Sequence, residues 1–280
     1  GNIPVTIDEY NIGGPDLISV PSYLHSSITN TSGMFNGASI FNQDISGWDM
    51  SNVTNISSMF YNATLFNQDI GGWDVSNVTN MASAFAGTGA FNQDIGGWDV
   101  SNVTDMDSLF YQAQAFNQDL NLWDVSNVTN MYGIFSETLV FNGNISNWDL
   151  SSVTEMSYMF SGAVAFNSDI SGWDFTITPA TNRLRMFAST GAFNQDISGW
   201  DMSNVTIMEE MFMDAQAFNQ DISGWDVSNV AIMQRMFMNA TDFNQDLSGW
   251  CVSAIPSEPT DFDTGAITWA LPKPVWGTCP

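Results

Sequence analysis

The chain has 280 residues, with 30 acidic and 4 basic side chains, a net charge of −26, one histidine and two cysteines. The charge argues against nucleic acid or an anionic membrane as a partner, because both are themselves negative. The single histidine argues against a Ser-His-Asp triad or a histidine-based zinc site, and without a run of about 18 apolar residues no membrane span is predicted.

A repeat with a fixed step occupies most of the chain. A Phe-Asn pair recurs nine times from Phe41 to Phe243 with a step of 25 residues, which is 27 once, and a tryptophan keeps the same register from Trp48 to Trp250. A propeller blade needs about 40 residues or more, so the step favours a solenoid. We predict a repeat solenoid over residues 28–250, an N-terminal cap over 1–27 and a C-terminal cap over 251–280.

The N-terminal segment is predicted to cover the first coil. Ile3, Val5 and Ile7 alternate with other residues, which is typical of a strand. The uncovered end of a solenoid exposes strand edges and apolar side chains. We therefore expect residues 1–27 to add short strands to the first coil.

The first half of each unit is predicted to be a strand. In Ile45-Ser-Gly-Trp48-Asp-Met50 the apolar residues have the spacing of the leucine-rich-repeat strand. This spacing predicts that Ile45, Trp48 and Met50 point inward and that the polar residues between them form a solvent-facing sheet surface.

The second half of each unit is predicted to be a helix. Thr79 is a good N-cap, and Met81, Ala84 and Phe85 have the i, i+3, i+4 spacing of a one-sided helix. The expected fold is an α/β solenoid, leucine-rich-repeat-like, of nine coils of about 25 residues, each a short strand plus a short helix.

The unit Phe-Asn-Gln-Asp-Ile-Ser-Gly-Trp-Asp-Val-Ser-Asn-Val-Thr-Asn-Met resembles a known repeat. It is similar to the 26-residue repeat of bacterial surface proteins, the BspA-like and mycoplasma lipoprotein-related leucine-rich-repeat proteins, and the resemblance covers Ile28 to Trp250. The resemblance implies an extracellular or cell-surface protein, or one on a virion surface, that adheres or binds. It supplies no catalytic residues, and we expect no enzyme.

Two aspartate columns accompany the repeat, with neighbouring members expected about 4.8 Å apart. Three interpretations stay open: turns in which each Asp accepts backbone amides, Ca²⁺ between coils, and a solvated acidic face. We favour turns for the column after Phe-Asn, and we consider Ca²⁺ for the column after each tryptophan. That candidate metal column contains Asp49, Asp74, Asp99, Asp124, Asp149, Asp174, Asp201 and Asp226.

The repeat is interrupted once. Between Trp173 and Phe187 the chain gains two residues and introduces Arg183 and Arg185, and Arg235 lies two coils further on. In so acidic a chain these arginines are candidates for a partner contact, internal or external. The alternative is a tolerated insertion whose arginines neutralise nearby carboxylates.

Both cysteines lie in the closing segment. A disulfide between Cys251 and Cys279 would contribute about 3 kcal/mol by chain entropy and would suit an oxidising compartment. The alternative is two free buried thiols.

Two functions from different classes follow. The first is a non-enzymatic surface protein that binds a protein or glycan ligand through its acidic sheet face, with or without Ca²⁺. The second is a structural protein whose copies assemble end to end into filaments.

Overall fold

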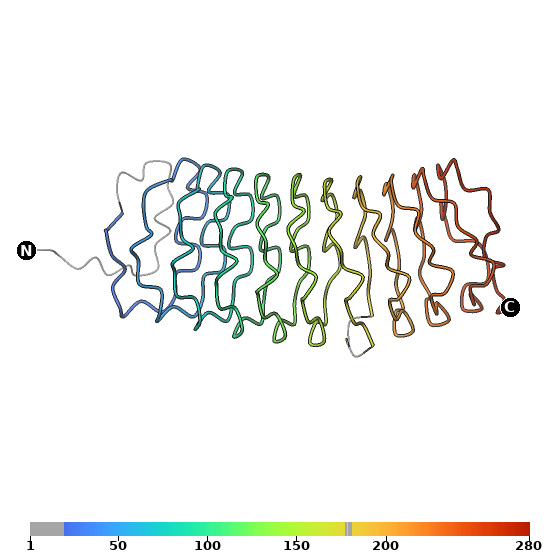
Figure 1. Ribbon diagram of the computed structural model, residues 1–280, viewed down its shortest axis with the longest axis horizontal. Coiled ribbons are helices and arrows are strands. Elements are labelled where there is room, and N and C mark those ends of the chain that lie inside the picture. The colour runs from blue at the N-terminus through green and yellow to red at the C-terminus, as the bar shows by residue number, and fades with distance from the viewer. Residues whose placement is uncertain (1–19, 177, 179–180) are drawn as a thin grey trace, which may run out of the picture.

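The computed structural model describes residues 20–176, 178 and 181–280, which form a linear stack of irregular coils (Figure 1). Coils that follow one another in sequence are neighbours in space, so the colour changes in order along the long axis. Isolated parallel bridges join equivalent residues of adjacent coils, first from Asn30 with Asn55 to Asn130 with Glu155, and then from Asn182 with Ile207 to Ile207 with Ile232. The predicted repeat step is thus the step of the stack.

The predicted internal structure of each coil is wrong. Within the described residues there is no helix, and extended structure is limited to these single bridge residues. The chain is therefore not an α/β solenoid of nine leucine-rich-repeat-like coils with a strand and a helix each. In the same part of the chain, no helix is long and apolar enough to cross a membrane.

The segment predicted as a helix is a series of turns. The Ala84 amide donates to the Met81 carbonyl at 3.0 Å, three residues back, but the Phe85 amide donates to the Leu109 carbonyl of the next coil at 3.0 Å. Ser83 between them has a φ of 56°, which breaks a right-handed helix. The amides therefore alternate between a bond inside the coil and a bond to the next coil.

Left-handed residues recur at two positions of every coil. A non-glycine residue held there costs about 1–3 kcal/mol, which the surrounding structure must offset. The amides bonded between coils provide such an offset: Ser58 donates to Ala82 and Asn62 to Ala86, both at 2.8 Å. The first column contains Gly33, Ser58, Ser83, Ser108, Gly133, Tyr158, Arg185, Glu210, Arg235 and Asp261.

The segment predicted as a strand also turns, although its inward side chains are as expected. Ile45, Trp48 and Met50 are buried, with 1%, 3% and 1% of their surface exposed. The Trp48 amide, however, donates to the Ile45 carbonyl at 3.0 Å, which closes a turn. The prediction that these side chains point inward is confirmed, and the prediction of a strand is wrong.

The core is a set of aromatic columns that run the length of the stack. Phe60 stacks on Phe66 of its own coil with ring centroids 3.9 Å apart, and on Phe85 of the next coil at 5.5 Å. The indole of Trp98 is buried, and its Nε1 donates to the Ile70 carbonyl at 3.1 Å. A buried indole needs such a partner, and the bond recurs in each coil.

An asparagine ladder joins the coils at another edge. The Asn92 amide donates to Asn67 Oδ1 at 3.0 Å, and Gln93 Nε2 donates to the Asn67 carbonyl at 3.0 Å. The ladder continues past the insertion, because the Asn194 amide donates to Asn167 Oδ1 at 2.9 Å. The two extra residues therefore leave the stack unbroken.

Residues 251–280 continue the stack beyond the last repeat. The Phe237 amide donates to the Phe262 carbonyl at 2.8 Å and the Val252 amide to the Thr278 carbonyl at 2.9 Å. The predicted disulfide between Cys251 and Cys279 is present, and the structure has no free cysteine. Cys251 stands where the other coils have the aspartate after tryptophan.

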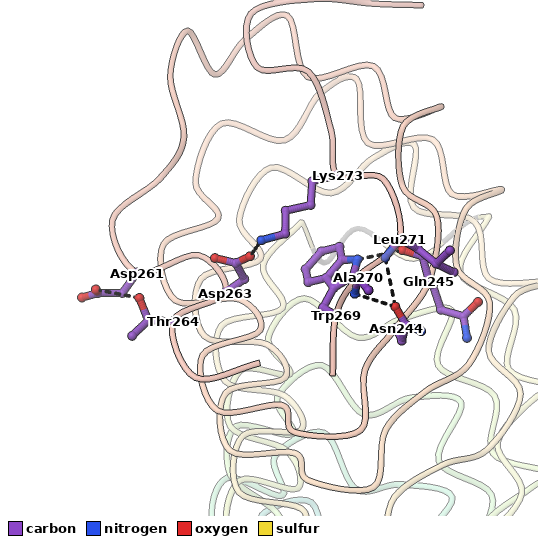
Figure 2. A network of polar contacts seen from close by, with 9 residues as sticks. All are labelled: Asn244, Gln245, Asp261, Asp263, Thr264, Trp269, Ala270, Leu271 and Lys273. Atoms are coloured by element: carbon purple, nitrogen blue, oxygen red, sulfur yellow. Dashed lines mark hydrogen bonds and ion pairs between the residues drawn. The ribbon is translucent and has the colours of Figure 1, made fainter. Parts of the chain in front are cut away.

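Figure 2 shows how the closing segment extends the ladder. Asn244 Oδ1 accepts the amides of Ala270 and Leu271 at 2.8 and 3.1 Å, and the Trp269 indole donates to the Gln245 carbonyl at 2.9 Å. Lys273 forms an ion pair with Asp263 within the closing segment.

At the other end, the Trp48 indole donates to the Pro21 carbonyl at 2.9 Å and Leu24 is buried. The segment from residue 20 therefore packs on the first coil. The strands expected around Ile3, Val5 and Ile7 lie outside the described residues.

Candidate functional site

The aspartates after tryptophan form turns. Asp99 Oδ1 accepts the Ser101 amide at 3.1 Å and the Ser101 hydroxyl at 2.6 Å. The hydroxyl and then the amide lower the pKa of Asp99 below its ordinary value. In every member of the predicted metal column, the carboxylate accepts a hydrogen bond from the backbone amide two residues further on. The column contains Asp49, Asp74, Asp99, Asp124, Asp149, Asp174, Asp201 and Asp226.

The aspartates after Phe-Asn have the turn role predicted for them. Asp94 Oδ1 accepts the Gly96 amide at 3.0 Å, and Asn144 substitutes for an aspartate with the same bond to Ser146. Turn formation therefore accounts for the residue type in both columns.

Ca²⁺ binding to the metal column stays a prediction. Among residues 20–176, 178 and 181–280 no three His, Cys, Asp or Glu side chains are grouped so that they could hold a metal ion. A ligand selective for the folded chain raises its melting temperature, so melting in millimolar Ca²⁺ and in EDTA tests the prediction. Identical melting in both would contradict it.

Two of the three candidate arginines bind one buried carboxylate. Glu210 is 3% exposed, and its carboxylate pairs with Arg185 of the preceding coil and with Arg235 of the following coil, the latter at 2.5 Å. Burial raises the pKa of Glu210, but the hydrogen bonds and the positive charges of the two arginines together lower it more, so the pKa lies below its ordinary value. The pairing matches the neutralising role that the sequence left open for these arginines.

Arg183 lies inside the core. It is fully buried, its guanidinium carbon lies 4.7 Å from the centre of the Phe175 ring, and burial lowers its pKa to about 10. Arg183 occupies the position that Met156 and Met208 hold in the adjacent coils. An external contact through Arg183 would require the side chain to leave the core.

Equivalent positions of successive coils divide the surface into a uniform part and a variable part. We define the turn face as the surface formed by Asp107, Ser108, Tyr111 and Gln112 and by the equivalent residues of other coils. The position of Ser108, to take one example, is occupied by Ser, Gly, Tyr, Arg or Glu in different coils. The tryptophan and asparagine columns, in contrast, hardly change. The turn face is thus the part of the repeat free to vary.

A groove of about 290 Å³ lies on the turn face. Three tyrosines from three successive coils form its aromatic surfaces, and serines lie between them. We name it the tyrosine groove, and its residues are Ser108, Tyr111, Tyr132, Gly133, Ser136, Glu137, Tyr158, Ser161 and Arg185.

Gly133 is the reason for the hollow. The equivalent positions before and after it hold Ser108 and Tyr158, but Gly133 has no side chain to fill the space. A Cβ built there would make ordinary van der Waals contacts of 3.6 Å with Ser108 Oγ and Ser136 Cβ. A larger side chain at this position would therefore extend toward the groove without a close contact at its Cβ.

The aromatic surfaces of the groove lie close together, and one already faces a cation. The rings of Tyr132 and Tyr158 have centroids 5.2 Å apart, and the Arg185 guanidinium carbon lies 5.5 Å from the Tyr158 centroid. This is within the reach of a cation–π interaction.

Carboxylates surround the tyrosines. The side-chain Nε2 of Gln112 donates to Glu137 Oε2 at 2.6 Å, and the Ser108 hydroxyl donates to Asp107 Oδ1 at 2.7 Å. Burial and then Glu137 raise the pKa of Tyr111. The groove is therefore aromatic in its walls and negative at its rim.

For Tyr132, burial, the Tyr158 ring hydroxyl and then Asp107 and Glu155 raise the pKa, and Arg185 lowers it. Two carboxylates and one guanidinium therefore act on the Tyr132 ring.

A second hollow, with a larger volume of about 420 Å³, lies on the uniform part of the surface. Two members of the metal column, Asp149 and Asp174, line it. Its residues are Ser146, Asn147, Trp148, Asp149, Leu150, Ser151, Gly172 and Asp174.

The tyrosine groove was not predicted from the sequence, because its residues lie outside the recurring aspartate, tryptophan and asparagine columns. The sequence signal for it is a cluster of tyrosines in three consecutive coils. No tyrosine stands at the positions equivalent to Tyr132 and Tyr158 in the other coils, whereas Tyr111 and Gly133 recur as Tyr61 and Gly33. The groove arises because these residues fall together in three consecutive coils.

The stacked coils, the uniform ladders and the variable face define a repeat protein. A family model described as "Mycoplasma protein of unknown function, DUF285" matches residues 18–119, 83–184 and 175–266, and the chain belongs to this family. The resemblance to mycoplasma-type repeats is thereby confirmed. No curated protein matches the chain.

Proposed function

We propose that the protein is a non-enzymatic recognition module of a cell or virion surface, which adheres to a protein or glycan ligand through its turn face. The observation that carries this proposal is the division of the surface. The tryptophan and asparagine columns that maintain the stack hardly change from coil to coil, whereas the turn face varies and contains the tyrosine groove. Binding surfaces of repeat proteins are built on such variable positions.

The proposal moves the binding surface away from the aspartate columns. The acidic face suggested by the sequence consists of turns that serve the fold, and the same turn recurs coil after coil. Catalysis by two carboxylates needs an acid and a base in different environments, which identical turns do not provide. This supports a binding role over an enzymatic one.

A surface location is part of the proposal. The disulfide between Cys251 and Cys279 supports it, because disulfides persist in oxidising compartments. A relationship to BspA-like proteins fits the same location.

The proposal is tested with the purified chain on peptide and glycan arrays. We expect Tyr132→Ala to remove binding and Asp124→Asn to leave it unchanged, because only Tyr132 belongs to the groove. The opposite pattern would assign binding to the aspartate column, and an absence of any binding by the unaltered chain would contradict the proposal.

A second candidate function is end-to-end assembly into filaments. One observation favours it: Ile267, Leu271 and Val275 of the closing segment are 82%, 43% and 60% exposed. Exposed apolar groups at the end of a stack suit another copy of the chain.

Light scattering over a range of concentrations tests this candidate. We expect the particle mass to grow with concentration, and Ile267→Asp together with Val275→Asp to stop the growth. A chain that stays monomeric at every concentration would contradict assembly, and so would growth that the two substitutions leave unchanged.

A further inference from the structure

We propose that the tyrosine groove binds a lysine or arginine side chain of a basic protein partner. The inference rests on the proposed recognition function and names its ligand. Four features of the groove lead to it: its charge, its aromatic surfaces, its size and the apolar residues beside it.

The charge of the groove is negative. Glu137 lines it, and Asp107 binds the hydroxyl of its lining residue Ser108. The one basic lining residue, Arg185, shares the Glu210 carboxylate with Arg235. Its charge offsets only part of the acidic groups, because Asp107 and Glu155 also act on Tyr132. In a chain with a net charge of −26, the surrounding field adds to the attraction for a cation and opposes an anion.

The tyrosines offer the surfaces that a cation prefers. A guanidinium or ammonium group is attracted to the face of an aromatic ring within about 6 Å. Arg185 already uses Tyr158 in this way, at 5.5 Å. Tyr132 is 39% exposed and Tyr111 is half-buried, so both can still receive a group from outside.

The size of the groove fits one long side chain. Its volume of about 290 Å³ lies at the lower end of the range for small-molecule sites, roughly 300–1,000 Å³. Gly133 and Glu137 both line the groove, so a side chain inserted there would share it with one carboxylate.

Apolar residues beside the groove favour a protein over a glycan as the partner. Leu139, Val140 and Val164 are 49%, 43% and 48% exposed. Leu139 follows the groove residue Glu137 by two positions, and Val164 is its equivalent in the next coil. A protein surface with a basic residue beside apolar ones would cover both features, whereas a sugar would leave the apolar residues exposed.

The experiment introduces an arginine into the groove by substitution, so that its side chain competes with a cation from outside. Gly133→Arg introduces a side chain that Arg185 and Arg235 already show at the equivalent position of other coils, with the same left-handed backbone. Ser58→Arg is the matched control, because it makes the same charge change at the equivalent position three coils away. Thermal melting of both variants checks that they remain folded.

The probe is a fluorescent peptide whose arginines are separated by glycines, compared with the same peptide carrying glutamine instead. Fluorescence anisotropy is measured in about 150 mM salt, where charges more than about 8 Å apart are largely screened. We expect the arginine peptide to bind, Gly133→Arg to weaken it at least tenfold, and Ser58→Arg to change it less than twofold.

A second substitution tests the aromatic wall without adding charge. Tyr132→Ala should also weaken the arginine peptide about tenfold, a size reached by cation–π contacts when they are desolvated. Its control is Tyr23→Ala, which removes a 50% exposed tyrosine away from the groove and should have no effect.

The outcomes separate this inference from the proposed function. If Gly133→Arg and Ser58→Arg weaken the peptide equally, binding reflects total charge and the inference is overturned. If the chain binds a glycan through Tyr132 and ignores the arginine peptide, the inference fails and the recognition function stands. If binding of the peptide and binding of the glycan are both unaffected by substitution of Tyr132 and of Gly133, the inference and the proposed recognition function both fail.

Discussion

Trp123 and Tyr132 lie nine residues apart in one coil and represent two different regions of the molecule. Trp123 belongs to a uniform column, is 3% exposed and donates its indole hydrogen to the Ile95 carbonyl at 3.0 Å. Tyr132 belongs to the turn face and is 39% exposed. The comparison teaches that in this repeat the recurring residues maintain the stack, and the residues that do not recur are available for binding.

The largest effect is expected from Trp123→Ala. Truncating a buried aromatic side chain costs about 3–5 kcal/mol, and the Ile95 carbonyl also loses its donor. Tyr132→Ala should cost clearly less, because 39% of the Tyr132 surface is already exposed to water. Urea denaturation measures both free energies of unfolding. Similar losses for the two variants would contradict the division of the surface.

Removal of the disulfide should have the next largest effect. Cys251→Ser with Cys279→Ser releases a link between residues 28 apart, worth about 3 kcal/mol by chain entropy. Because each coil contacts only its neighbours, we expect the loss to be concentrated in the closing segment. Hydrogen exchange should therefore become faster around Trp269 and stay unchanged around Trp123. Uniformly faster exchange would mean that the stack unfolds as one unit.

Glu210→Gln should have a smaller effect that depends on pH. Hydrogen bonds to charged groups contribute about 1.5–3 kcal/mol, and here both arginines can partly return to water, so we expect about 1–2 kcal/mol at neutral pH. The pKa of Glu210 is lowered on folding. Its contribution is therefore complete above the unfolded pKa of about 4.3 and is lost as pH falls through the folded value.

Denaturation of the two chains between neutral pH and about pH 3 measures this dependence. The difference in stability between the unaltered chain and Glu210→Gln should shrink as the solution becomes acidic. A difference that is constant over this range would mean that the ion pairs to Arg185 and Arg235 do not stabilise the fold.

Asp124→Asn should have the smallest effect, below about 0.5 kcal/mol, because an asparagine oxygen accepts the same turn amide. Asn55 and Asn80 form such turns elsewhere in the coils. The Ser126 hydroxyl and then its amide lower the pKa of Asp124, so the carboxylate stabilises the fold above its unfolded pKa and loses this contribution in acid. The variant should lose a little less stability in acid, which parallel acid titrations can check. A loss above about 1 kcal/mol at neutral pH would give the carboxylate a role beyond the turn.

The sequence was enough to predict the step of the stack, the inward phase of Trp48 and Met50, the disulfide and the turn role of aspartates such as Asp94. These depend on spacing and on local preference, both of which are visible in one chain. The helix at Met81–Phe85 could not be excluded in this way, because a series of turns buries the same i, i+3, i+4 positions. What differs is the partner of each amide, and the amide of Phe85 finds its partner in the next coil.

The candidate site was predictable only in part. Arg185 and Arg235 were noticed as exceptions to the acidic composition, but the buried carboxylate of Glu210 that joins them was not. The substitution of Arg183 for a core methionine has no local signal, because an arginine beside an insertion also suits an exposed loop. The tyrosine groove depends on Gly133, which is an ordinary turn residue until its neighbours Ser108 and Tyr158 are placed beside it.

The asparagine ladder has a consequence for how such a gene can change. Because Asn92 bonds to Asn67 in the same way that Asn117 bonds to Asn92, removing or duplicating one whole coil joins two surfaces that already fit. Recombination between copies of the repeat can therefore lengthen or shorten the molecule and keep the asparagine ladder intact. The same events would carry individual turn-face residues to new neighbours, so that a lineage could exchange its binding surfaces by shuffling intact coils.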